Sequence, residues 1–137
     1  MQKTIPMVSA VTLLTTALCL TACRIPDLPD DPIVFPKCTV QNTPDDSYIG
    51  IEWDGRTYVM YGALKNGVKY GECLGYIEGD ENDRIYTVED CPAEQYLINF
   101  YVHGEMEQAV VLRELGTKGS SAPDIADAYG YEIWKAE

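Results

Sequence analysis

The clearest structural signal lies at residues 48–61, which read YIGIEWDGRTYVMY. Ile49, Ile51 and Trp53 alternate with other residues, so they share one face of an extended strand. Asp54-Gly55 follows, a pair typical of the two-residue type I′ turn, because that turn needs positive φ at both central positions. The chain then returns with a second alternating pattern that ends at Tyr61. This stretch therefore predicts a β-hairpin.

Two more hairpins follow along the chain. Residues 72–77 and 84–88 flank a turn rich in Gly and Asp, while residues 96–102 and 106–113 flank His103-Gly104. Together the three hairpins give six strands in consecutive antiparallel pairs. The sequence therefore predicts an all-β fold: an antiparallel meander of about six strands that closes into a small barrel or folds into a sandwich.

The C-terminal residues carry weaker signals. Residues 121–129 predict a short helix, because Pro123 lies near its first turn, and residues 131–135 fit a last edge strand. Neither element changes the all-β class.

The N-terminal residues have the parts of an export signal in order. Lys3 supplies positive charge, residues 8–20 are uncharged, and Leu20-Thr21-Ala22-Cys23 closes the apolar stretch. This stretch is too short for a membrane-spanning helix, which needs about 20 residues. The four closing residues resemble the lipobox of bacterial lipoproteins. The resemblance implies that residues 1–22 are a signal peptide and that a lipidated Cys23 anchors the chain to a membrane, outside the cytoplasm. The alternative is an ordinary secretory signal peptide with a chance cysteine.

Residues 23–47 are typical of a tether that lifts a β-rich domain, residues 48–137, away from the membrane. Aspartates keep such a segment solvated, and frequent prolines interrupt helices and sheets. Residues 33–35 are the one apolar part of this segment, and docking of these residues on the domain is an alternative. The prolines are Pro26, Pro29, Pro32, Pro36 and Pro44.

The charge of the chain excludes one class of partner. The formal net charge is −12, and removal of residues 1–22, which hold Lys3 and no acidic residue, makes it −13. An acidic domain repels the phosphates of nucleic acids and anionic lipid head groups. We therefore expect no nucleic-acid partner.

Three cysteines remain after the signal peptide and Cys23. If the second hairpin turns at residues 79–84, Cys73 and Cys91 lie nearly opposite each other, so a disulfide between them is expected in an oxidising compartment. The alternative pairs Cys38 with one of these two and pins the tether to the domain. Without a CxxC motif, a redox-active thiol is not indicated.

The remaining polar candidates point away from catalysis. Asp80 and Asp83 lie in an acidic turn that is a weak candidate for calcium and is otherwise a solvated loop. His103, the single histidine, is expected to be an exposed turn residue. Hydrolase, zinc-protease, phosphate-loop and dinucleotide motifs are all missing from the sequence. We expect no enzyme activity, no metal and no cofactor.

Tyrosine is unusually frequent, with ten in the chain. Tyrosine packs well in sheets, so most of these residues are expected to be structural. Tyr58 and Tyr101 are the candidates for an exposed binding patch, because a tyrosine offers an apolar ring and a polar tip to a glycan, peptide or protein.

Residues 71–77, 84–88 and 96–98 resemble strands of small β-rich domains in uncharacterised bacterial envelope lipoproteins. That resemblance implies a fold class and carries no catalytic residue. The sequence as a whole favours a lipid-anchored domain outside the cytoplasm that binds an envelope protein, a cell-wall component or an external ligand. The alternatives are a structural or assembly lipoprotein of the envelope and, less favoured, a small hydrolase that uses acidic residues.

Overall fold

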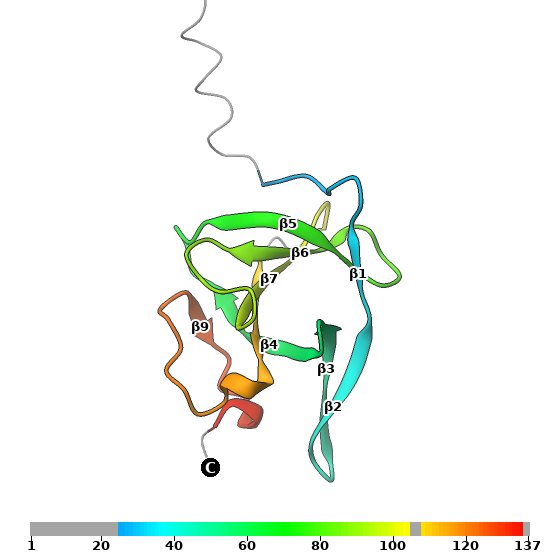
Figure 1. Cartoon of the computed structure of the whole chain (residues 1–137). Coiled ribbons are helices and arrows are strands. Elements are labelled where there is room, and N and C mark those ends of the chain that lie inside the picture. The colour runs from blue at the N-terminus through cyan, green and yellow to red at the C-terminus, as the bar shows by residue number, and fades with distance from the viewer. Residues whose placement is uncertain (1–24, 105–107, 136–137) are drawn as a thin grey trace, which may run out of the picture.

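The computed structural model describes residues 25–104 and 108–135, so the predicted signal peptide (residues 1–22) and the predicted lipidation site Cys23 lie outside the described residues. The described part is all-β, with one curled, mixed sheet of nine strands and two short 3-10 helices (Figure 1). The strands are β1 (Ile33–Phe35), β2 (Lys37–Thr43), β3 (Asp46–Trp53), β4 (Arg56–Leu64), β5 (Tyr70–Ile77), β6 (Asp83–Val88), β7 (Tyr96–Tyr101), β8 (Val110–Glu114) and β9 (Ala126–Ala128). The 3-10 helices are η1 (Leu115–Thr117) and η2 (Glu132–Trp134).

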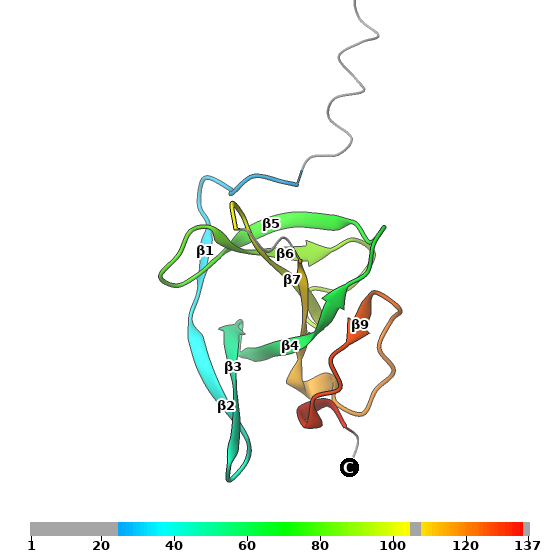
Figure 2. The same cartoon turned by 180° about the vertical axis from the view of Figure 1, so that it is seen from behind.

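The two ends of the sheet belong to one continuous stretch of chain. The strand order is β1-β5-β6-β7-β8-β4-β3-β2, and only Pro36 separates β1 from β2. Phe35 O accepts a hydrogen bond from Glu78 N, just past β5, and Pro36 O accepts one from Glu52 N of β3, both at 3.0 Å. The sheet therefore curls until this stretch, called the strap (residues 33–43), touches both of its ends (Figures 1 and 2).

The three hairpins predicted from sequence are confirmed as the pairs β3–β4, β5–β6 and β7–β8. In the first hairpin, Trp53 pairs with Arg56, and Asp54 and Gly55 both have positive φ, at 50° and 73°. This is the backbone geometry that the Asp-Gly turn predicts. Local turn chemistry thus accounts for six of the nine strands.

The predicted tether is wrong for residues 33–47. β1 pairs with β5 in parallel, and β2 forms a further antiparallel hairpin with β3. The prolines do not interrupt this pairing, because Pro32 precedes β1, Pro36 separates β1 from β2, and Pro44 lies in the turn before β3. A missing N–H is tolerated at strand ends and turns. The β-rich domain therefore begins near residue 33 rather than at residue 48.

The simple meander and the strand count of six are also wrong. After β4, the chain crosses over so that β4 pairs with β8, while β5 pairs with β6 and β1. The result is a mixed sheet, curled as a half-barrel, in which the first hairpin lies beside the third.

The predicted C-terminal helix at residues 121–129 is replaced by β9. β3 covers β4 only up to Val59, which leaves one edge of Gly62 to Leu64 without a partner. β9 pairs with those three residues, because buried backbone donors and acceptors must be satisfied. The expected final strand is instead the turn η2, whose Trp134 donates its indole N–H to Met60 O at 2.8 Å.

Apolar side chains pack on both faces of the sheet. The inner cluster fills the curl with residues from β1 and from β3 to β8. The outer cluster lies on the opposite face of β5 to β8 and is covered by loops. Neighbouring residues such as Ile85 and Tyr86 are both fully buried because they point to opposite clusters. The inner cluster is Phe35, Ile51, Tyr58, Ile77, Ile85, Leu97 and Leu112, and the outer one is Cys73, Tyr86, Val88, Tyr96, Ile98, Ala109 and Val111.

Arg113 of β8 is the one buried charged side chain among the described residues. Its Nη2 donates to Thr117 O and Ser120 O, both at 2.7 Å, and its Nε donates to Thr117 Oγ1 at 2.9 Å. Aromatic rings cover the guanidinium and stabilise its charge through cation–π contacts. The rings are Tyr61, Trp134 and Tyr96, with centroids 5.2, 5.2 and 5.9 Å from the guanidinium carbon.

We predict that Arg113→Met lowers the free energy of unfolding by about 2–3 kcal/mol, because it removes the hydrogen bonds of the buried guanidinium to Thr117 and Ser120 together with its cation–π contacts. Urea unfolding followed by circular dichroism measures the change. Lys135→Met, at an exposed cation on the C-terminal segment, is the matched control and should change stability far less. Equal effects of the two changes would contradict this role for Arg113.

Candidate functional site

The strongest candidate site is an apolar cleft at the side where the sheet stays open, called here the seam cleft. It forms where the chain leaves β5: β1 pairs with β5, but after Pro36 the chain continues as β2, which pairs with β3 and not with β5. Its volume is about 260 Å³. The lining residues come from seven strands: Lys37, Ile49, Gly50, Ile51, Tyr58, Met60, Ile77, Asp83, Asn99 and Leu112.

The floor and rim of the seam cleft follow from the strand register. Ile51 lies opposite Tyr58, and Met60 lies opposite Leu112, so all four side chains face inward. Ile51, Tyr58 and Leu112 are buried and form the floor. Ile49 and Met60 lie at the rim and are 71% and 39% exposed. Large apolar side chains with this exposure are a marker of a binding surface when they border a concave site.

The polar groups of the seam cleft are few and already bonded. Asn99 donates from Nδ2 to Asp83 Oδ1 at 2.7 Å and to Arg84 O at 3.1 Å. The backbone N–H of Lys37 donates to Glu78 Oε1 at 2.7 Å. The cleft therefore suits an apolar group, with carboxylates and one ammonium at its edge.

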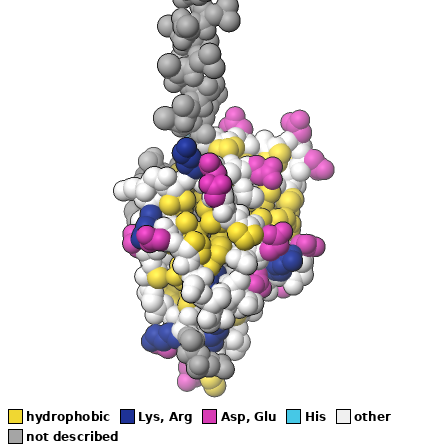
Figure 3. Space-filling model, turned by 60° about the vertical axis from the view of Figure 1, so that its left-hand side comes forward, with side chains coloured by type: hydrophobic (Ala, Val, Ile, Leu, Met, Phe, Trp, Pro, Cys, Tyr) yellow, Lys and Arg dark blue, Asp and Glu magenta, His cyan; other side chains and the backbone are white. Residues whose placement is uncertain are grey.

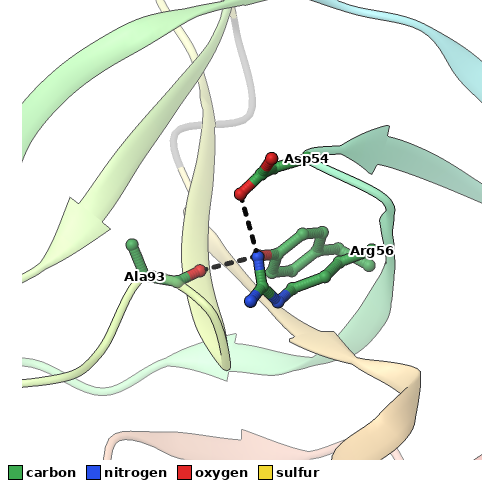
Figure 4. Close-up of polar contacts among 4 residues, drawn as sticks. Asp54, Arg56 and Ala93 are labelled. Carbon is green, nitrogen blue, oxygen red and sulfur yellow. Dashed lines mark hydrogen bonds and ion pairs between the residues drawn. The ribbon is translucent and has the colours of Figure 1, made fainter.

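A second concavity, the hairpin groove, has a volume of about 450 Å³ and lies between β1 and the β3–β4 turn. Arg56 Nη1 bonds Asp54 Oδ2 at 3.2 Å across its edge (Figure 4). Trp53 contributes to the wall, but its ring packs against Phe35 and Tyr58, at centroid distances of 5.9 and 6.4 Å. The groove is wider and more polar than the seam cleft, and its charged pair is already satisfied.

Tyr58 is not the exposed binding residue that the sequence suggested. Its side chain is fully buried, and its hydroxyl donates to Ala93 O at 2.8 Å (Figure 4). Burial raises the pKa of Tyr58 to about 12. Tyr58 therefore fixes the 92–95 turn to the inner cluster and contributes to a binding site only as part of the cleft floor.

Tyr101 is exposed, as expected, but its hydroxyl is engaged with the acidic turn. It donates to Asp80 Oδ2 at 2.6 Å, and Asn82 N donates to Asp80 Oδ1 at 2.9 Å. Both bonds favour the ionised carboxylate and lower the pKa of Asp80, with the Tyr101 bond the larger cause. The carboxylate of Asp83 accepts a hydrogen bond from Asn99 instead, so Asp80 and Asp83 have different partners. The described residues include no cluster of metal ligands.

The predicted disulfide does not form. Cys38, Cys73 and Cys91 are all free thiols. Cys73 lies opposite Tyr86 rather than opposite Cys91, because the hairpin pairs Tyr76 with Arg84 and β6 ends at Val88, before Cys91. Burial raises the pKa of each thiol, which disfavours the reactive thiolate. His103 is exposed in its turn with a φ of 67°.

Four of the other eight tyrosines take part in ring contacts that hold the C-terminal segment against the sheet. Tyr48 and Tyr131 lie 5.4 Å apart between ring centroids, and Tyr129 and Tyr131 lie equally close. Tyr61 contacts Trp134 edge to face at 5.8 Å. The high tyrosine content is therefore explained largely by packing.

Sequence reasoning missed Ile49 as a site residue, and it placed Met60 on the same strand face as Tyr58 without singling it out. The sequence did hold a signal for Ile49, because Ile49 continues the alternation of Ile51 and Trp53 by one more inward-facing position. The pairing of β3 with β4 stops just before it, at Gly50 and Val59. At Ile49, β3 still pairs with Thr39 of β2 but no longer with β4, so an inward-facing side chain there stays exposed. The face in Figure 3 also shows hydrophobic side chains gathered in the middle, with Asp and Glu around them.

Searches against models of protein families, curated proteins and solved structures found no match to this chain. Among the described residues, none of the helices has the length and apolar character needed to cross a membrane.

We predict that Tyr101→Phe raises the pKa of Asp80 toward its ordinary value, because the variant loses the main donor to the ionised carboxylate. An Asp whose folded pKa is lowered stabilises the fold above about pH 4, and that contribution disappears as the pH falls through the folded pKa. The variant should therefore be less stable than wild type near neutral pH, and the two should converge in acid. Titration of the Asp80 carboxyl carbon by NMR measures the shift, with Tyr76→Phe as the control. An unchanged Asp80 pKa would contradict the role of Tyr101.

Proposed function

We propose that this chain is a lipid-anchored binding domain outside the cytoplasm and that its ligand places an apolar group in the seam cleft. The observation that carries the proposal is the exposure of Ile49 and Met60 at the rim of a cleft with an apolar floor. Covering such surface is favourable by about 25 cal/mol per Å² of apolar area removed from water. The mouths of curled sheets are common places for ligand sites.

The anchor in this proposal rests on the lipobox resemblance at Leu20 to Cys23. A lipidated Cys23 holds the domain at a membrane of the cell envelope, where a short segment before Ile33 separates it from the lipid. The strap belongs to the domain, so this segment is shorter than the 23–47 tether. An envelope protein or a cell-wall component fits this location, and the acidic charge disfavours nucleic acid.

Binding is favoured over catalysis by the chemistry of the seam cleft. The carboxylate in its lining, Asp83, already accepts a hydrogen bond from Asn99, and most of the lining is apolar. General acid–base hydrolysis needs a positioned proton donor and acceptor near the bond that breaks. The seam cleft instead offers an apolar surface that suits binding of an apolar group.

We predict that Ile49→Glu abolishes binding of Nile red, a neutral apolar dye, because it places a charge at the rim of the seam cleft. Dye fluorescence gives the affinity, and the ¹³C-methyl NMR signal of Met60 reports where the dye sits. Val34→Glu is the matched control, since Val34 is also an exposed strand residue but lines the hairpin groove.

The wild type and Val34→Glu should bind the dye with a shift of the Met60 methyl signal, and Ile49→Glu should not. Loss of binding in Val34→Glu alone would move the site to the hairpin groove and contradict the proposal. Absence of any dye binding to the wild type would also contradict it.

A further inference from the structure

We propose that the ligand of the seam cleft is an extended segment of another polypeptide, which adds as a strand to the free edge of β2 and places alternate apolar side chains in the cleft. This inference rests on the proposed function, because it uses the same cleft. It adds the backbone of β2 as the second half of the site.

The free edge of β2 follows from its pairing. β2 is the last strand in the sheet order and pairs only with β3 in the described part of the chain. In an antiparallel pair, the backbone groups of successive residues point alternately toward and away from the partner. Glu52 N donates to Pro36 O, so Pro36 points toward β3 and the next residue, Lys37, points away. The bond from Lys37 N to Glu78 confirms this outward direction.

The same alternation places the N–H and C=O groups of Thr39 and Gln41 on the outer edge, whereas Cys38 and Val40 bond β3. Both Thr39 and Gln41 are exposed and uncharged. Proteins usually block such edges with charges, bulges or prolines. Here Lys37 and Pro36 block the end nearest β1, and the irregularity between Gln41 and Thr43 lies at the other end, so the open part of the edge runs from Thr39 to Gln41.

The seam cleft lies along this edge on the inner side of the sheet. Lys37 and Ile49 form one wall, while Ile77, Asp83 and Asn99 from β5, β6 and β7 form the other. Neighbouring strands lie about 4.8 Å apart, and residues directly opposite in an antiparallel pair share a face. A residue opposite Thr39 therefore points its side chain to the same face as Thr39 and Ile49, which are paired in the sheet. That face is the one that lines the cleft.

Charge defines the rest of the partner. Glu78 and Asp83 carry two carboxylates at the cleft edge, against the single ammonium of Lys37, and the whole chain has a net charge of −12. A strand with β-branched apolar residues facing the cleft fits its apolar lining, and Lys or Arg on the opposite face complements the negative net charge of the chain. Strand addition of this kind takes its affinity from the backbone and its specificity from the alternate side-chain pockets.

The test uses the full chain in detergent and a synthetic peptide of about nine residues, the length of a strand, in which Val alternates with Lys. Two matched peptides carry N-methyl groups, one on all Val amides and the other on all Lys amides. In antiparallel addition, the inward-facing Val residues bond β2, so methylation of the Val amides should abolish binding. Methylation of the Lys amides should leave it. Amide hydrogen exchange by NMR should slow by about tenfold at Thr39 and Gln41 on addition of the unmethylated peptide, with no change at Val40.

A variant of the protein tests the same edge from the other side. Thr39→Pro removes one outward N–H that β3 does not use, and prolines are tolerated on edge strands. It should weaken peptide binding at least about tenfold, whereas Thr39→Val, which keeps the N–H, should not. If only the Lys-methylated peptide fails to bind, strand addition is still supported, but in the parallel direction, because the outward-facing Lys residues then bond β2.

Equal binding of all three peptides, or no binding of the unmethylated one, would overturn strand addition. Nile red separates this failure from failure of the proposed function. If the dye still binds in the seam cleft, the cleft is a ligand site without strand addition; if neither dye nor peptide binds, both proposals fail.

Discussion

The hydrogen bonds that the strap, residues 33–43, makes to two different strands hold the sheet in its curl. On one side β1 runs parallel to β5, so closely that a Cβ at Gly75 would lie 1.8 Å from Ile33 O, and only glycine fits there. On the other side β2 pairs with β3. Phe35, between them, is fully buried in the inner cluster. Where β1 pairs with β5, the strap closes the sheet. Because the chain turns away from β5 at Pro36, the seam cleft stays open beside β2.

The parts of the fold that sequence could predict are those set by neighbours in the chain. The Asp54-Gly55 turn and period-two alternation give three hairpins, since turn geometry and register are local. The strap could not be predicted in this way, because its prolines are also typical of a disordered tether. β9 was missed for a related reason: its pairing depends on the length by which β4 extends beyond β3, a contact between distant residues.

The candidate site shows the same division. Alternation correctly places Tyr58 and Met60 on one face, but it does not say how far each lies from the end of the curl. In the structure Tyr58 is buried in the floor of the cleft, whereas Met60 is partly exposed at its rim. The Cys73–Cys91 prediction assumed that the pairing continues as far as residue 91, whereas β6 ends at Val88 and its register places Cys73 opposite Tyr86. The lining of the seam cleft comes from seven strands, which only the curl of the sheet brings together. For that reason, no short motif in the sequence marks the seam cleft.

The most direct test of this account is to measure nuclear Overhauser effects between backbone protons across both sides of the strap in the full chain. The account predicts contacts between Val34 and Tyr76 on the β5 side and between Thr39 and Ile49 on the β3 side. Both sets are required, because the seam cleft exists only if one stretch of chain joins both ends of the sheet. A strap with no long-range contacts, as a solvated tether would show, would contradict the account.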